Sequence, residues 1–338
     1  MNILVTAPYS AEAREQLQAY GNVFYHPWKP HGRAFRSDEL LGLLRETNAD
    51  ALITEHDQVD ASVIEATNLR FIGVCRGTPS NVEIGKATEK RIPVFNTPAR
   101  NAQAVAELVT AALIVFLRKM REGETWLKSR EWKSDAHESY LHFRGHELAG
   151  KTVGLIGFGG VGQRVAEVLR GFSCRIQYYD PYLKQSPDPQ FHRSTIEEIF
   201  MTSDIVSIHL PVTEETKSLI GERLLRLMKP DAILVNSARA SVVERGALLS
   251  ALKERRIAGA ILDVFYHEPP DESDYELILL PNVYATPHIA GASYEVDDHS
   301  AIMMNRVLEQ WFVHQNRNIR QLVNPEVLTA EGMGNDEL

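Results

Sequence analysis

Short apolar runs alternate with stretches of helical periodicity along almost the whole chain. Runs in the first hundred residues predict strands at 3–7, 23–25, 51–54, 71–75 and 94–96. A second series predicts strands at 152–156, 175–179, 205–209, 232–236, 260–264 and 283–285. Strands that alternate with helices are typical of β-α-β units around parallel sheets. The pattern therefore predicts the α/β class, with two doubly wound parallel sheets.

The segments before and after the second series of strands are predicted to be helices and a loop or arm. Apolar periodicity predicts helices at 100–120 and at 293–314. Residues 121–150 are polar and show no clear period, which predicts a loop or an arm. The run Ser194-Thr195-Ile196-Glu197 fits a capping box at a helix start, and residues 331–338 are expected to fray.

Composition narrows the function classes. At 338 residues the chain has about twice the length of a typical domain, which favours two domains. The net charge is −9 and Lys and Arg form no dense stripe, so we expect no nucleic-acid partner. No run is long enough for a membrane span and no secretory signal is apparent, so we expect a cytoplasmic protein. Cys75 and Cys174 adjoin apolar runs and are expected to be buried thiols.

The sharpest local motif is Gly157-Phe158-Gly159-Gly160-Val161-Gly162, which follows a predicted strand and opens a helix. Gly157 permits a tight turn, Gly159 lets the backbone approach a pyrophosphate, and Gly162 lets the helix lie close to the strand. Asp180 follows the next strand, where an acid accepts hydrogen bonds from the adenosine ribose. Because this acid repels a 2′-phosphate, the motif predicts NAD as the cofactor in preference to NADP.

Three polar residues follow later strands of the same series. Arg239, Glu268 and His288 come shortly after the strands predicted at 232–236, 260–264 and 283–285. Arg239 can bind a substrate carboxylate with two hydrogen bonds. His288 can donate a proton to the oxygen of a 2-keto acid as it is reduced, and Glu268 can hold the other ring nitrogen. Taken singly, each could be an ordinary surface or turn residue.

A metal site is not predicted. His142 and His146 are four residues apart, which could place both on one helix face, but Gly145 lies between them and no acid-rich partner is near. Exposed loop histidines are the simpler interpretation.

These motifs together resemble the D-isomer-specific 2-hydroxyacid dehydrogenase family, which includes phosphoglycerate, glycerate and D-lactate dehydrogenases. The resemblance covers nearly the whole length of the chain. The matching stretches are Asn96-Thr97-Pro98, Ala104 to Glu107, Leu148 to Gly162, His209-Leu210-Pro211, Asn236 to Arg239, Asp263-Val264-Phe265, Glu268-Pro269 and Thr286 to Gly291. The resemblance implies a flavodoxin-like substrate domain of residues 1–98 and 294–338, with a Rossmann NAD-binding domain of residues 99–293 inserted in it. The strand pattern alone would leave the C-terminal tail with the second domain.

The resemblance also implies roles for particular residues. Arg239, Glu268 and His288 would form the catalytic triad, and Asp263 would face the nicotinamide carboxamide. His209 would be a cofactor-pocket residue in preference to a second base. Further cofactor contacts are expected at Gly160, Val161, Pro211, Thr216, Ser237, Ala238 and Gly291. The family further implies a homodimer, with the helix at 100–120 in the interface.

One loop departs from the family pattern. After the strand at 71–75 the family carries two glycines that bind the substrate carboxylate, whereas this chain reads Arg76-Gly77-Thr78. Gly77 is retained, and Arg76 and Thr78 could bind a second anionic or hydroxylated group, such as a phosphate or a sugar-acid hydroxyl. Alternatively, Arg76 points to solvent or pairs with an acid.

Two other functions fit the same scaffold. One is an NAD-sensing regulator or corepressor, in which the dinucleotide sets a conformation for partner binding. The other is formate or phosphite oxidation, but formate enzymes of this type carry Gln where this chain has Glu268. The intact set of Arg239, Glu268 and His288 favours an NAD-dependent enzyme that interconverts a D-2-hydroxy acid and its 2-keto acid.

Overall fold

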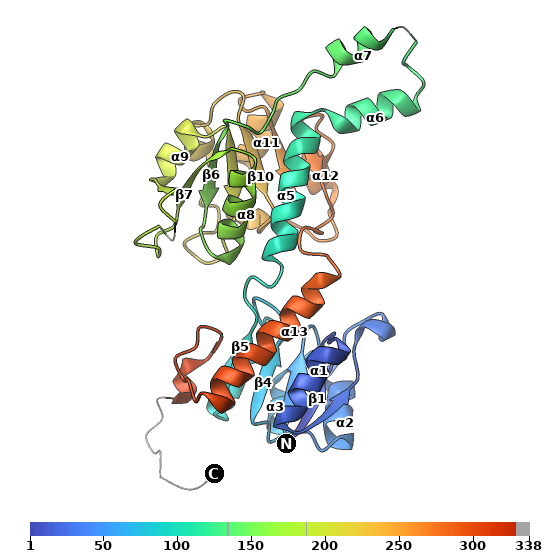
Figure 1. Ribbon diagram of the computed structural model, residues 1–338, viewed down its shortest axis with the longest axis vertical. Helices are drawn as coiled ribbons and strands as arrows, with labels where there is room; N and C mark the ends of the chain where they lie inside the picture. The colour runs from blue at the N-terminus through green and yellow to red at the C-terminus, as the bar shows by residue number, and fades with distance from the viewer. Residues whose placement is uncertain (134, 187, 329–338) are drawn as a thin grey trace. The chain divides into compact units, whose positions relative to one another are not determined.

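The computed structural model describes residues 1–133, 135–186 and 188–328. The chain divides into two compact units. The first unit is Met1–Arg100 together with the chain from Ser293 onward, and the second unit is Asn101–Ala292 (Figure 1). The tail at 331–338 lies outside the described residues.

The first unit contains a five-stranded parallel sheet in the order β2-β1-β3-β4-β5. This is the flavodoxin-like order, with helices on both faces. The strands are β1 (Asn2–Val5), β2 (Asn22–Tyr25), β3 (Ala51–Thr54), β4 (Phe71–Val74) and β5 (Val94–Asn96). The helices are α1 (Ala11–Leu17), α2 (Ser37–Glu46), α3 (Ala61–Glu65), α4 (Ile84–Glu89) and α13 (Glu295–Leu308).

Helix α13, although it follows the second series of strands, belongs to the first unit. Met304 and Leu308 lie in the same buried cluster as Phe71 and Phe95. The buried amide of Asn305 donates to the carbonyl of Ala13 in α1 at 2.9 Å. The return of the chain to the first unit therefore completes its core.

The second unit contains a seven-stranded parallel sheet in the order β12-β11-β10-β9-β6-β7-β8. Its strands are β6 (Thr152–Ile156), β7 (Arg175–Tyr179), β8 (His192–Arg193), β9 (Ile205–Ile208), β10 (Ile233–Asn236), β11 (Gly259–Leu262) and β12 (Val283–Ala285). This is the dinucleotide-binding order with one further edge strand. The short β8 was not predicted. The predicted fold class of two doubly wound parallel sheets is confirmed.

Helices cover both faces of this sheet. On one face, α5 (Ala102–Leu117) and α8 (Gly160–Gly171) share a buried apolar cluster with the sheet. On the other face, a second cluster involves α9 (Ile196–Thr202), α10 (Glu222–Leu225), α11 (Arg245–Lys253) and α12 (Glu272–Ile278).

Three local predictions differ from the structure in detail. Residues 121–150 are not a plain loop, because they contain α6 (Met120–Lys128) and α7 (Ala136–His142). The capping box lies one residue later than predicted, since Thr195 accepts from the Glu198 amide at 3.2 Å and Glu198 accepts from the Thr195 amide at 2.9 Å. Helix α13 is α-helical only to Leu308, and Glu309–Val313 continue it as a π-helix.

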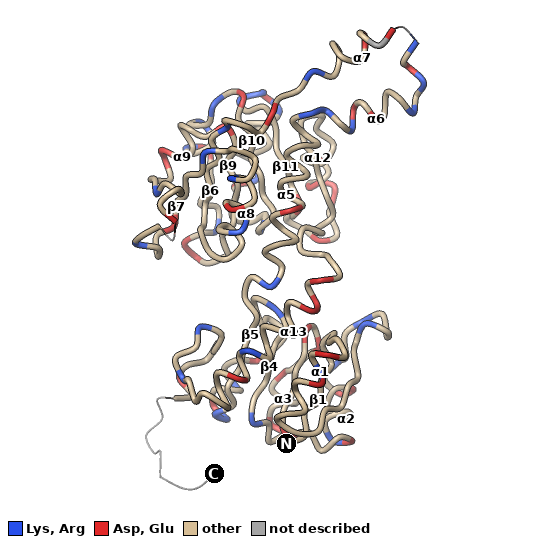
Figure 2. The backbone as a smooth tube through the Cα atoms, viewed as in Figure 1, with Lys and Arg blue, Asp and Glu red and all other residues tan. Residues whose placement is uncertain are grey.

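Surface charge and burial agree with the composition. Figure 2 shows acidic and basic residues interspersed over both units, without a basic stripe. Cys75 and Cys174 are buried free thiols. Within the described part of the chain, no helix has the length and hydrophobicity that a membrane crossing requires.

Candidate functional site

The strands of the second sheet end in register. Ala285, Leu262, Asn236, Ile208, Ile156 and Tyr179 lie side by side across six strands. The next residue on each strand is Thr286, Asp263, Ser237, His209, Gly157 or Asp180. Parallel sheets bind ligands outside this carboxyl edge. The structure therefore brings five residues that the sequence singled out to one edge: Asp263, Ser237, His209, Gly157 and Asp180.

The glycine motif forms a turn in which each predicted glycine has a distinct surrounding. Gly157 has φ +92°, and a Cβ there would lie 2.6 Å from the carbonyl oxygen of His209. A Cβ on Gly162 would lie 2.3 Å from the oxygen of Gly157, whereas one on Gly159 would meet no atom within 4 Å. Gly157 and Gly162 are thus required by the fold, and Gly159 leaves open space. Since α8 begins at Gly160 and Val161, its first amides are available to a phosphate group.

Asp180 is tied to the glycine motif. Its Oδ2 accepts from the Phe158 amide at 2.9 Å, and its Oδ1 accepts from the amides of Tyr182 and Leu183 at 2.9 and 3.2 Å. The carboxylate therefore shapes the loop and also places a negative charge at the end of β7.

His209, the first residue after β9, has an uncharged imidazole. Burial lowers the pKa of His209 to about 4, so its imidazole is neutral at pH 7. Its Nε2 lies 3.0 Å from Ser207 Oγ. Thr216 donates to the Pro211 carbonyl at 2.6 Å and closes the following turn. An imidazole with so low a pKa is a weak base, which is consistent with a pocket residue that does not exchange protons.

Ser237 and Gly291, two further predicted cofactor contacts, differ from each other in their surroundings. The Oγ of Ser237 is buried and has no hydrogen-bond partner among the described residues, so it can accept or donate to a bound group. The adjacent Ala238 amide donates to Asn236 Oδ1 at 3.1 Å. At Gly291, by contrast, a Cβ would lie 2.3 Å from the side-chain Nδ2 of Asn101, which gives this glycine a packing reason.

Asp263 is a buried carboxylate that holds the loop after β12. Its Oδ1 accepts from Thr286 Oγ1 at 2.5 Å and from the Ile289 amide at 2.9 Å, and its Oδ2 accepts from the Ala290 amide at 2.7 Å. These bonds flank His288 on both sides. In this structure the carboxylate is engaged with that loop, and the contact with a nicotinamide carboxamide remains a prediction.

His288 and Glu268 form a direct pair. His288 Nδ1 lies 2.7 Å from Glu268 Oε2, and the two side chains are 43% and 40% exposed. Glu268 Oε1 accepts from the Phe265 amide at 3.2 Å. His288 has φ +53°, a left-handed backbone that is uncommon outside glycine and is often found at functional sites. Because Nδ1 is engaged with the carboxylate, Nε2 is the ring atom that remains for a substrate.

Arg239 follows β10, the neighbour of β11 in the sheet. Its backbone carbonyl accepts from Asn236 Nδ2 at 3.0 Å, and its Nη1 donates to the Ala238 carbonyl at 2.7 Å. The guanidinium is exposed, so its other donors can reach a carboxylate. The structure thus joins His288 to Glu268 directly and places Arg239 at the same edge.

The loop Arg76-Gly77-Thr78 follows β4 in the first unit. The Thr97 amide donates to the Arg76 carbonyl at 2.9 Å, and Asn96 Nδ2 donates to the Gly77 carbonyl at 2.7 Å. A Cβ on Gly77 would have its nearest neighbour at 3.8 Å, so packing does not require glycine there. Gly77 and Thr78 are exposed.

The histidine pair that could have bound a metal is not on one helix face. His142 is the last residue of α7, and His146 lies beyond its end. Sequence reasoning missed a different group, His267, Asp271 and Asp274, whose ligand-type atoms lie within 4.8 Å of one another. The spacing His-x3-Asp-x2-Asp could have drawn attention to it.

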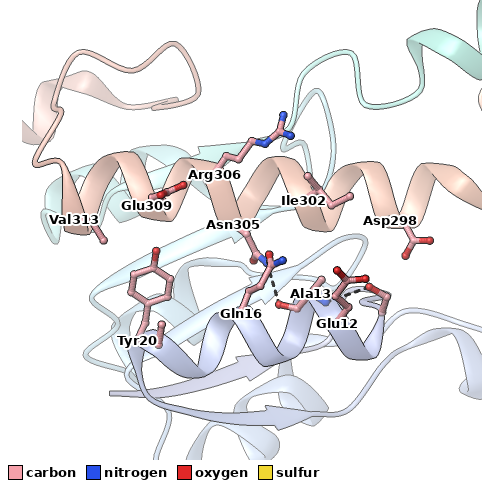
Figure 3. A pocket seen from close by; sticks show the side chains of 12 residues that line it. Glu12, Ala13, Gln16, Tyr20, Asp298, Ile302, Asn305, Arg306, Glu309 and Val313 are labelled. Atoms are coloured by element: carbon pink, nitrogen blue, oxygen red, sulfur yellow. Dashed lines mark hydrogen bonds between the residues drawn. The ribbon is translucent and has the colours of Figure 1, made fainter.

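A groove of about 780 Å³ runs between α1 and α13 in the first unit (Figure 3). Glu12, Asp298 and Glu309 line it together with Arg306. Three carboxylates against one guanidinium suit an anionic acid poorly. We therefore do not assign the substrate to this groove.

The strand order and the glycine motif of the second unit are those of a dinucleotide-binding domain. Residues 110–290 match the model of the D-isomer specific 2-hydroxyacid dehydrogenase, NAD binding domain. The chain is 53% identical over 334 residues to a protein of Bacillus subtilis named as a candidate 2-hydroxyacid dehydrogenase, YoaD, with 98% of this chain and 97% of that protein covered. The chain belongs to the D-isomer-specific 2-hydroxyacid dehydrogenase family and is an NAD-dependent oxidoreductase.

Other relatives agree with this assignment. A glyoxylate reductase of Thermococcus litoralis is 38% identical over 296 residues, which cover 86% of this chain and 88% of the relative. Among solved structures, an acyclic imino acid reductase in complex with NADPH and D-arginine has a TM-score of 0.74 and 27% identity, covering 96% of this chain and 99% of that chain. D-2-Hydroxyisocaproate dehydrogenase, with a TM-score of 0.78 and 23% identity over 96% of this chain and all of that chain, shares the fold.

Proposed function

We propose that this enzyme uses NADH to reduce a small 2-keto acid to the D-2-hydroxy acid, with His288 as the proton donor. The single observation that carries this proposal is the 2.7 Å contact between His288 Nδ1 and Glu268 Oε2, because it engages Nδ1 and leaves Nε2 as the ring nitrogen available to a substrate. NAD is favoured over NADP because Asp180 places a carboxylate at the end of β7 beside the glycine motif.

The residues divide the work as follows. Bound NADH supplies the hydride. Arg239 binds the substrate carboxylate and polarises the neighbouring carbonyl with its exposed donors. His288 Nε2 donates its proton to the carbonyl oxygen, and in the reverse direction it removes that proton. Glu268 stabilises the protonated imidazole and fixes its orientation.

The loop of the first unit supplies a second part of the proposal. Gly77 and Thr78 bind the substrate, and Arg76 contributes a positive charge for a phosphate or a further hydroxyl. Support comes from Gly77, where neither packing nor a left-handed backbone demands glycine. The close approach of a ligand to the backbone is a remaining reason for it.

A homodimer is the third part. Apolar side chains are exposed on the arm after α5: Leu127 is 58%, Tyr140 72% and Leu141 64% exposed. Such side chains are typical of surfaces that a partner covers. Residues 100–120 together with the arm form the interface in this proposal, and light scattering should give twice the mass of one 38.0 kDa chain.

The test is a panel of keto acids with NADH and with NADPH, followed by loss of absorbance at 340 nm. Glyoxylate, hydroxypyruvate, its phosphorylated form and a 2-keto sugar acid cover the alternatives at Arg76. We expect turnover with NADH to exceed that with NADPH for at least one of them. Tight NADH binding without turnover of any keto acid would contradict the proposal and favour an NAD-sensing regulator. If Arg76→Ala leaves the preference between phosphorylated and plain substrates unchanged, Arg76 has no role in selection.

A further inference from the structure

Asp274 is a buried carboxylate that the proposed chemistry does not use. It lies in the first turn of α12 and is 0% exposed. Its Oδ1 accepts from the Tyr266 amide at 3.1 Å, and its Oδ2 accepts from the His267 amide at 3.0 Å. His267 Nδ1 also lies 3.1 Å from Oδ2. A buried carboxylate is stable only when such partners replace water, and here all of these partners lie just before Glu268.

The segment that Asp274 holds determines where Glu268 lies. Glu268 folds back so that Oε1 accepts from the Phe265 amide, and this leaves Oε2 for His288. The Tyr266 hydroxyl donates to the Val243 carbonyl at 2.7 Å, which fixes the same segment from another side. The Glu268 side chain is itself 40% exposed, so its position depends on the backbone that carries it.

The cluster of His267, Asp271 and Asp274 does not require a metal. Both Asp274 oxygens are engaged by backbone amides, and Asp271 caps α12 by accepting from the Asp274 amide at 3.0 Å. A cation would have to replace these bonds. The contacts instead describe a support between α12 and the loop that carries Glu268.

We propose that Asp274 is a positioning residue that presents Glu268 to His288. This inference rests on the proposed function, because it concerns the pair assigned to proton transfer. Without the carboxylate, the part-buried amides of Tyr266 and His267 lose acceptor oxygens, and the backbone at 266–267 shifts to regain them. A displacement of about 1 Å at a reacting group can reduce the rate by about a hundredfold.

The experiment compares the pH profiles of keto-acid reduction in Asp274→Asn and Glu268→Gln with that of the wild type. A carboxylate at hydrogen-bond distance favours the protonated imidazole, so Glu268→Gln should move the high-pH fall in the rate of reduction to lower pH. Asp274→Asn should move this fall in the same direction by a smaller amount and lower kcat about tenfold. The KM for NADH should change less than about twofold, because the glycine motif is untouched.

Two controls separate positioning from general damage. Asp204→Asn alters another carboxylate that accepts a backbone amide, that of Thr152 at 2.7 Å, but it lies before β9 at the opposite edge of the sheet. This variant should lose stability and retain the wild-type pH profile. Glu272→Gln neutralises an exposed acid in the same turn of α12. It should leave both the stability and the pH profile unchanged.

The outcomes distinguish the two levels of the argument. If Asp274→Asn keeps the wild-type pH profile while the profile of Glu268→Gln shifts, the inference is overturned and the proposed function stands. No shift in Glu268→Gln removes the role given to Glu268. If Asp274→Asn does not fold, Asp274→Ser is measured in the same way, since its hydroxyl can still accept from one amide and the same direction of shift is expected.

Discussion

The two parallel sheets of this protein end in edges of different character. At the edge of the second sheet, His288 is bonded through Nδ1 to Glu268, and its Nε2 remains for a substrate. At the edge of the first sheet, Glu55 is 3% exposed and its oxygens face Trp28 Nε1 at 3.0 Å and Arg100 Nη1 at 2.7 Å. Glu55 follows β3 directly, and Glu268 lies in the loop that follows β11. Glu268 holds an imidazole whose Nε2 is left for a substrate, whereas buried Glu55 faces Trp28 and Arg100, with His56 Nε2 farther away at 3.7 Å.

This difference separates a functional acid from a structural one. The carboxyl edge of a parallel sheet collects polar residues because the strands end there, whatever their role. The distinguishing feature is whether the carboxylate and the side chains bonded to it use all their polar atoms on one another, or leave one polar atom exposed. The Glu268 and His288 pair leaves one, whereas Glu55 is enclosed by a tryptophan and an arginine.

The largest expected effect is on catalysis, at the His288 imidazole. His288→Gln should lower kcat by about a hundred- to ten-thousandfold, because the proton donor is lost. Steady-state oxidation of NADH with the best keto acid measures this loss. The matched control is His192→Gln, an exposed histidine of the same sheet, which should keep wild-type kcat. Equal losses in the two variants would show that the effect is not specific to His288.

The next largest effect is on stability, at the buried carboxylate of Glu55. Glu55→Gln leaves the Arg100 charge, which is 16% exposed, without its ionic partner, and should lower the free energy of unfolding by about 3 kcal/mol. Urea denaturation measures the change. Glu65→Gln breaks an exposed pair with Lys86 in the same unit and should cost less than about 1 kcal/mol. A large loss of kcat in folded Glu55→Gln would contradict the structural role.

A smaller effect is expected at His209. Burial lowers its pKa to about 4, so the unfolded chain binds more protons than the folded chain between pH 4 and pH 6.5. Stability should therefore fall as the pH falls through this window. Between pH 7.5 and pH 5, wild type should lose at most about 2 kcal/mol more than His209→Gln, and solvent at the partly exposed ring reduces this value. Equal losses in urea titrations at the two pH values would exclude a depressed pKa.

Local patterns predicted most of the strands and the glycine motif. The fully buried strands read as continuous apolar runs, and the glycines have requirements that depend on nearby backbone, such as the positive φ of Gly157. The pairing of Glu268 with His288 could be expected from the shared edge. Their 2.7 Å contact could not, because it depends on how two loops fold.

Other features depend on long-range contacts that no local pattern contains. The arm helices α6 and α7 are short and polar, and the two-residue β8 exists through its pairing with β7. Asp274 reads in the sequence as an ordinary acid near a helix start. Its role as an acceptor for the Tyr266 and His267 amides follows from the packing of α12 against the preceding loop.

The central claim is that His288 Nε2 donates to the substrate oxygen. A crystal structure with NADH and oxamate, an unreactive keto-acid mimic, tests it most directly. The account predicts Nε2 within about 2.6–3.2 Å of the carbonyl oxygen of the inhibitor, with the Glu268 contact retained. An inhibitor bound beside the nicotinamide, with His288 turned away and another group at that oxygen, would contradict the account.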